Sequence, residues 1–166
     1  MTEQNLEAEI LEHQELELAN DEKQLLIFKL LGNEYGFDIM LVREIKSWQG
    51  ATRIPNSPNF VKGVMNLRGV IIPIFDLAKR FGYDHTEVNT KNVVIVIKID
   101  EYTIGFLVDI VSDIISINKS KLDTPTSNNE SAIDESFVEG LLSYSGRIIT
   151  ILNVNKLFDK ETIKNA

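Results

Sequence analysis

Few side chains in this chain could carry out chemistry, and they are widely separated. The two histidines, His13 and His85, lie in polar segments, and neither has a second imidazole or a metal-ligand spacing beside it. Asp109 and Asp113 lie four residues apart and could face one another only on a helix; carboxylates at this spacing more often stay solvated or bind turn backbone. The chain has no cysteine, which excludes thiol nucleophiles and thiolate metal sites. We therefore predict a protein that is not an enzyme and has no metal or cofactor.

Several glycines in this chain lie at the ends of apolar segments that we expect to be strands. Gly63 opens a segment that reaches an Asn-Leu-Arg-Gly turn at Gly69 and continues as an apolar strand over 70–77. Glycine adopts backbone angles closed to other residues, which suits a tight hairpin. No glycine is followed by the lysine and helix of a phosphate-binding loop. About ten short strands with turn signals between them, and only short helices, predict an all-β fold of small barrels.

The sequence contains an internal duplication. Residues 63–81 align without gaps with residues 140–158 and share seven identities in nineteen positions. A spacing of about seventy residues is typical of a duplicated subdomain rather than a solenoid. We predict two β-barrel subdomains within residues 24–158, the first over about 24–82 and the second over about 93–158.

A second pair of segments, 25–45 and 94–114, aligns in the same way. It superposes two pairs of apolar residues, which are Val42 with Val111 and Ile45 with Ile114. These residues either fill two equivalent cores or line a seam between the two halves, where proteins commonly bind partners. Arg68 is either a solvated turn residue or a guanidinium held across a groove by a carboxylate such as Glu44.

The net charge of −8 lies entirely at the N-terminus. Residues 1–22 carry eight acidic residues and no Lys or Arg, and the remainder has seventeen residues of each sign. We expect residues 1–23 to form an acidic disordered tail and residues 159–166 a C-terminal tail. The alternative for the N-terminus is a short amphipathic segment that docks on a partner. The rest of the chain has equal numbers of acidic and basic residues, so it lacks the excess of positive charge that is typical of a nucleic-acid binder.

The longest apolar runs are much shorter than the ~20 residues of a membrane span, so we expect a cytoplasmic protein without direct membrane insertion. Two kinds of function remain for such a chain: an adaptor that binds proteins, and a small-ligand sensor with its pocket between the two barrels.

Over about residues 24–158 the chain resembles CheW, the family of coupling proteins in bacterial chemotaxis. The segments that carry the resemblance are YGFDI at 35–39, VREI at 42–45, IPNSP at 54–58, FVKG at 60–63 and, above all, NLRGVIIPIFDL at 66–77. The Asn-Leu-Arg-Gly block also occurs in the regulatory domain of the kinase CheA and in CheV, but this sequence contains neither a histidine-kinase core nor a receiver domain.

The resemblance implies two five-stranded SH3-like barrels around a shared core. It also implies a non-enzymatic adaptor that couples the histidine kinase CheA, through its regulatory domain, to the cytoplasmic tips of methyl-accepting chemoreceptors. Such a protein would be a monomer when free and would be recruited to a receptor–kinase array at the membrane. The pathway could control flagella or another output.

By position, the resemblance implies a receptor-binding groove formed or supported by six residues: Val42, Glu44, Arg68, Val93, Val111 and Ile114. Phe60 and Gly63 fall near surfaces of kinase or other partner contact. On this interpretation, Arg68→Ala and Val42→Glu would each weaken receptor binding and leave the protein folded.

Overall fold

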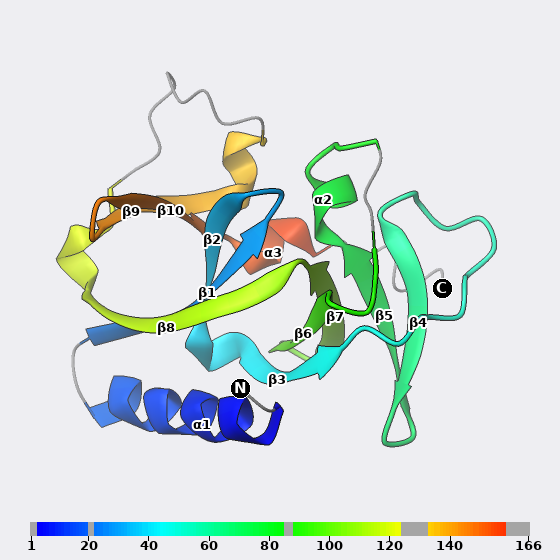
Figure 1. Ribbon diagram of the computed structural model, residues 1–166, viewed down its shortest axis with the longest axis horizontal. Coiled ribbons are helices and arrows are strands. Elements are labelled where there is room, and N and C mark those ends of the chain that lie inside the picture. The colour runs from blue at the N-terminus through cyan, green and yellow to red at the C-terminus, as the bar shows by residue number, and fades with distance from the viewer. Residues whose placement is uncertain (1–2, 20–21, 85–87, 124–132, 159–166) are drawn as a thin grey trace.

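In the part of the chain that the computed structural model describes, ten strands form two five-stranded sheets, which lie side by side (Figure 1). The structure describes residues 3–19, 22–84, 88–123 and 133–158. The first sheet has the order β8-β1-β2-β10-β9 and consists of β1 (Glu22–Leu30), β2 (Asn33–Asp38), β8 (Ile110–Asn118), β9 (Val138–Tyr144) and β10 (Arg147–Leu152). The second has the order β3-β6-β7-β5-β4 and consists of β3 (Val42–Ser47), β4 (Val61–Leu67), β5 (Val70–Asp76), β6 (Val93–Ile99) and β7 (Tyr102–Val108).

The helices are short apart from the first. They are α1 (Glu3–Ala19), α2 (Leu77–Arg80) and α3 (Val154–Leu157), with 3-10 turns η1 (Ile39–Leu41), η2 (Lys119–Lys121) and η3 (Glu135–Phe137). The predicted predominance of β structure is confirmed, as are the two groups of five strands. The predicted C-terminal tail lies outside the described residues.

Each sheet takes strands from both copies of the sequence repeat. In the first sheet, β1 and β2 from the first copy pair with β8 and β10 from the second; in the second sheet, β6 and β7 pair with β3 and β5. In the repeat, β1 to β5 of the first copy are equivalent to β6 to β10 of the second, in that order. If each strand is replaced by its equivalent, the strand order of one sheet becomes that of the other. The boundaries expected from the repeat, 24–82 and 93–158, therefore do not separate the two sheets.

The exchange of strands depends on close backbone packing at two glycines. β2 lies parallel to β10 with Gly36 opposite Ile151, and β7 lies parallel to β5 with Gly105 opposite Ile74. A Cβ atom at Gly36 would lie 2.9 Å from Cδ1 of Ile151, and one at Gly105 would lie 2.7 Å from Cδ1 of Ile74. The repeat thus places a glycine at both parallel contacts between a strand of one copy and a strand of the other.

The apolar core is divided into a shared cluster and one cluster belonging to each sheet. Along β1, Leu26 and Phe28 belong to the shared cluster, whereas Leu25 and Ile27 belong to the cluster of the first sheet. The strand β6 alternates in the same way between the shared cluster and that of the second sheet. Because both faces of these strands are buried, their sequences read as continuous apolar runs.

Helix α1 occupies the place of the expected disordered tail. It packs on β1 and β3 (Figure 1), and the side chain of Ile10 is only 2% exposed. The side-chain amide of Gln14 donates hydrogen bonds to the carbonyl oxygens of Ile39 (2.8 Å) and Val42 (2.9 Å). The expectation of disorder is therefore wrong for residues 3–19, because one helix face finds partners in the sheets that composition alone does not reveal.

Arg80 connects α2 to the elements near the C-terminal end of the described chain. Its guanidinium lies 4.8 Å from the ring centroids of both Phe60 and Phe137, and its Nε donates to the carbonyl oxygen of Leu157 (3.0 Å). We expect Arg80→Ala to lower the free energy of unfolding by about 2–3 kcal/mol, because two cation–π contacts and a charged hydrogen bond are lost. Urea denaturation measures this change, with the exposed Arg53→Ala as the control. A loss of under about 0.5 kcal/mol, the usual range for surface substitutions, would contradict the assignment.

Candidate partner-binding groove

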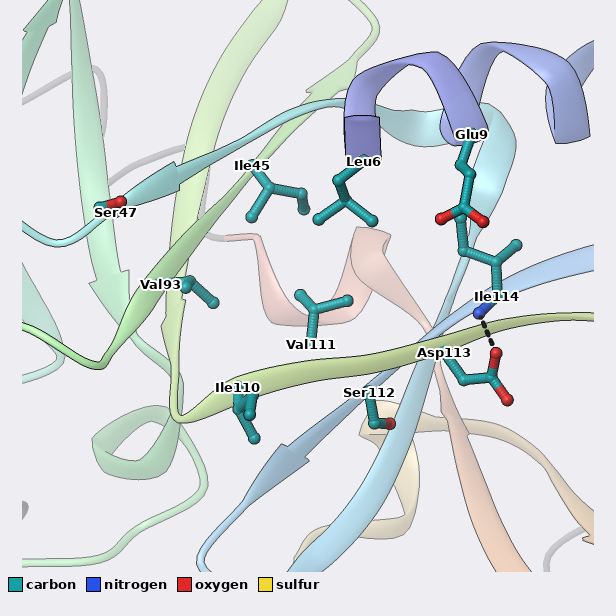
Figure 2. A pocket seen from close by; sticks show the side chains of 10 residues that line it. All are labelled: Leu6, Glu9, Ile45, Ser47, Val93, Ile110, Val111, Ser112, Asp113 and Ile114. Carbon is teal, nitrogen blue, oxygen red and sulfur yellow. Dashed lines mark hydrogen bonds between the residues drawn. The ribbon is translucent and has the colours of Figure 1, made fainter. Parts of the chain in front are cut away.

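A hollow of about 360 Å³ opens between β3 and β8, which are edge strands of the two sheets (Figure 2). Its lining residues are Leu6, Glu9, Ile45, Ser47, Val93, Ile110, Val111, Ser112, Asp113 and Ile114. In Figure 2 the side chains of Leu6, Ile45, Val93 and Val111 point into this space. The groove is thus built from both sheets and from α1, and its centre is apolar.

A β-bulge in β8 turns two of the lining residues toward the groove. The register between β1 and β8 shifts at Ser112, whose hydroxyl donates to the carbonyl oxygen of Ile27 (3.2 Å). In a regular strand, residues an odd number apart point to opposite faces, but the extra residue of a bulge brings Val111 and Ile114 to the same side. β3 has a register shift at the equivalent position, between Val42 and Glu44.

Three of the six predicted groove residues line the hollow. Val93, Val111 and Ile114 are partly exposed and contribute to its wall. Val42 instead belongs to the shared core and is 1% exposed. Val42 can support the groove from beneath, but it offers no surface to a partner in this conformation.

Arg68 and Glu44 form the ion pair that the sequence suggested. Nη2 of Arg68 lies 2.6 Å from Oε2 of Glu44, with the Arg68 side chain 69% exposed and that of Glu44 8% exposed. The hydrogen bond to Glu44 and its charge raise the pKa of Arg68, and Glu7 of α1 adds a smaller effect in the same direction. Neither residue lines the hollow itself: Glu44 precedes the lining residue Ile45 in β3, and Arg68 is within electrostatic range of Glu7 in α1.

A two-residue turn holds Arg68 in position. β4 and β5 pair up to Leu67 and Val70, which leaves Arg68 and Gly69 as the loop, with φ angles of 51° and 87°. Two positive φ angles indicate a type I′ turn, whose twist matches that of the strands. The amide of Gly69 donates to Oδ1 of Asn66 (2.9 Å), which accounts for the asparagine of the Asn-Leu-Arg-Gly block.

The second carboxylate oxygen of Glu44, Oε1, is buried and has no hydrogen-bond partner among the described residues. A buried acceptor left unpaired costs about 1–3 kcal/mol. Among the described residues Arg68 forms the ion pair with Glu44, so removing its guanidinium would leave a buried carboxylate without this counter-charge.

Phe60 and Gly63 lie outside the groove, and packing accounts for both. The ring of Phe60 contacts that of Phe75 edge-on, with centroids 5.5 Å apart, and the guanidinium of Arg80 covers it. Gly63 has a φ of +147°, and a Cβ atom there would lie 2.8 Å from the carbonyl carbon of Thr52. Their predicted role in partner contact stays a prediction.

The histidine and aspartate side chains that were considered as possible catalytic groups form hydrogen bonds with neighbouring groups, where the structure describes them. Nδ1 of His13 lies 2.5 Å from Oε1 of Gln24, and His85 falls outside the described residues. Asp109 accepts from the amide of Leu31 (2.8 Å), and Asp113 accepts from the amide of Ile114 (2.9 Å). Within the described ranges, no three acidic or imidazole side chains cluster as metal ligands, and no helix is long and apolar enough to span a membrane.

The contribution of α1 to the groove was not predicted from the sequence. Leu6 and Glu9 line the hollow, and Ile10 packs below them in the core. The available signal was the four-residue spacing of Leu6 and Ile10, which is typical of one face of a helix. Ile45 also lines the hollow; the sequence left it between a core position and a seam position, and it was not among the six predicted groove residues.

Comparison with known proteins gives one consistent result. The family model of the CheW-like domain matches residues 24–162. The chemotaxis protein CheW of Rhizobium meliloti is 36% identical over 144 residues, which is 87% of this chain and 92% of that protein. The chemotaxis protein CheW of Bacillus subtilis is 30% identical over 90% of this chain and 95% of its own length.

A solved structure agrees with these sequence matches. The crystal structure of the scaffolding protein TtCheW from Thermoanaerobacter tengcongensis superposes with a TM-score of 0.76 at 34% identity, covering 84% of this chain and 90% of that one. The matched family domain begins at residue 24, so α1 lies outside it.

Proposed function

Because the chain belongs to the CheW-like family and is a coupling adaptor of chemotaxis, we propose that it joins the kinase CheA to methyl-accepting chemoreceptors without catalysing a reaction. The groove between β3 and β8 receives a helix from the cytoplasmic tip of a receptor. The observation that carries this proposal is an apolar hollow, walled by Val93, Val111 and Ile114, with the Arg68–Glu44 ion pair joined to the neighbouring strand β3 through Glu44. A groove of this kind suits the apolar face of an amphipathic helix.

We also infer that each five-stranded sheet curls into an SH3-like barrel. Two observations support this inference: each sheet has its own apolar cluster, and Arg68, at the end of β4, reaches Glu44 on β3 although these strands form opposite edges of one sheet. The edges of the barrels then pair with the like-folded regulatory domain of CheA. The free adaptor is a cytoplasmic monomer that is recruited to receptor–kinase arrays at the membrane.

We expect Arg68→Ala to weaken binding of a chemoreceptor cytoplasmic fragment by about tenfold or more, equivalent to ~1.4 kcal/mol, and to leave binding of the CheA regulatory domain unchanged. The loss follows because the arginine disappears and Glu44 of the neighbouring strand β3 is left unpaired. Pull-down with each partner separately, followed by titration calorimetry, measures both affinities.

The matched control is Arg147→Ala, which removes an arginine paired with Glu34 (2.9 Å) near the tip of the equivalent hairpin, β9–β10. It should not affect the receptor affinity. Thermal unfolding of both variants separates a binding effect from loss of structure. Equal losses of receptor affinity in the two variants would show that the groove is not the receptor site.

A further inference from the structure

Helix α1 lies against the groove that the proposed function assigns to a receptor helix. Leu6 and Glu9 form its wall on one side, opposite Val111 and Ile114 of β8 (Figure 2). Four residues after Leu6, the side chain of Ile10 enters the shared core. The N-terminal part of α1 therefore borders the groove, and its apolar residues face the sheets.

We propose that α1 is an intramolecular occupant of the receptor groove, which a receptor helix must displace in order to bind. The proposal rests on the proposed function, since it concerns the same groove. It assigns a role to the acidic N-terminal segment, which lies outside the matched family domain. The groove would then exist in two states, one covered by α1 and one open to the partner.

The contacts of α1 are suited to reversible detachment. Ile10 is its only buried apolar residue among the side chains that the structure describes. Its polar contacts include the two hydrogen bonds that Gln14 donates to the carbonyl oxygens of Ile39 and Val42, and the contacts of His13 and Glu17 with Gln24 at the start of β1. Leu11 and Leu18 point away from the sheets and are 57% and 77% exposed. Most of the stability of a helix in a protein comes from the tertiary packing of its apolar face, so these contacts decide whether α1 stays docked.

The residues that α1 presents also indicate the chemistry of the helix that replaces it. Leu6 and Ile10 are four residues apart, and they fill the apolar part of the contact. Glu9 faces the hollow, and the negative charge of Glu7, between Leu6 and Ile10, adds slightly to the rise in the pKa of Arg68. The competing receptor helix should therefore carry two apolar side chains four residues apart and a carboxylate that faces the hollow, as Glu9 does.

The first test compares two full-length double variants by titration with a chemoreceptor cytoplasmic fragment. Ile10→Ala with Gln14→Ala loosens the docked face, whereas Leu11→Ala with Leu18→Ala changes the exposed face of the same helix. We expect the first variant to bind the fragment about tenfold more tightly than the wild type, because a larger fraction of its grooves is open. The second should stay within about twofold of the wild type, as residues outside the contact do not change that fraction.

The second test uses the wild-type chain and avoids any effect of substitution on folding. Amide hydrogen exchange is measured across residues 3–19 with and without a saturating amount of the receptor fragment. Displacement predicts that the amides of α1 lose protection when the fragment binds, while those of β3 and β8 gain it.

The outcomes separate this proposal from the proposed function. If the fragment binds the wild type and α1 stays protected, or if the loosened variant binds more weakly, α1 is a permanent wall of the site and the displacement proposal is overturned alone. If the fragment binds neither the wild type nor the loosened variant, both proposals fail.

Discussion

Replacing Gly63 by alanine should lower the free energy of unfolding by about 2–5 kcal/mol. Two costs add at this position. The backbone has a φ of +147°, which L side chains rarely adopt, and strain of this kind costs about 1–3 kcal/mol. The new methyl group would also press on the backbone carbonyl of Thr52, a residue held by two hydrogen bonds to Val64, and overpacking costs a further 1–3 kcal/mol or so.

Gly69→Ala is the matched control, because Gly69 also has a positive φ of +87° but has no atom within 4 Å of the added Cβ. It should show only the backbone cost, about 1–2 kcal/mol. Urea denaturation of both variants and the wild type measures the difference. Equal losses would show that the contact with Thr52 is not what selects glycine at position 63.

Val42→Glu should unfold the protein or destabilise it by about 3–5 kcal/mol, since it places an unpaired carboxylate in the shared core. This corrects the expectation from the sequence that the substitution would leave the fold intact. Val111→Glu, at the aligned position of the repeat, should change stability by less than about 1 kcal/mol, because the side chain is partly exposed and can stay hydrated. It should weaken receptor binding instead.

The pH dependence of the Val42→Glu variant offers a check on burial. Burial raises the pKa of a carboxyl group above its unfolded value of about 4.3. At a pH between the unfolded pKa and the raised folded pKa, the folded protein keeps the proton on Glu at position 42, whereas the unfolded chain releases it. The destabilisation relative to wild type therefore grows as the pH rises above about 4. Denaturation midpoints at pH 4 and pH 7 measure this trend. A pH-independent difference would mean that the introduced carboxylate reaches water.

The hairpin turns could be predicted from the sequence because they depend on the backbone angles of one or two residues. The turns at Gly32, Gly69 and Gly146 each have a residue with positive φ followed by the glycine, as two-residue hairpins demand. The repeat was equally readable, since aligned residues need no knowledge of the fold. Family membership followed from the same turn and strand segments, and the comparisons confirm it.

Only part of the groove could be predicted from the sequence. Val93, Val111 and Ile114 were identified by position and do line it, but α1 was not expected there at all. Composition indicated a solvated acidic tail, because most of α1 is indeed polar and only a narrow face makes contacts. Such a face is recognisable only once the surface that receives it is known.

The sequence by itself determined the strands, their turns, the duplication and the family. The tertiary structure alone decided which strands pair, because the two copies carry nearly the same local signals and exchange partners across the molecule. It also decided that Val42 is buried while Val111 lines a groove, although the repeat makes them equivalent. The physical reason is that burial depends on what packs against a residue: Val42 lies within the shared core cluster, whereas Val111 lies at the border of that cluster and faces the hollow between the two sheets.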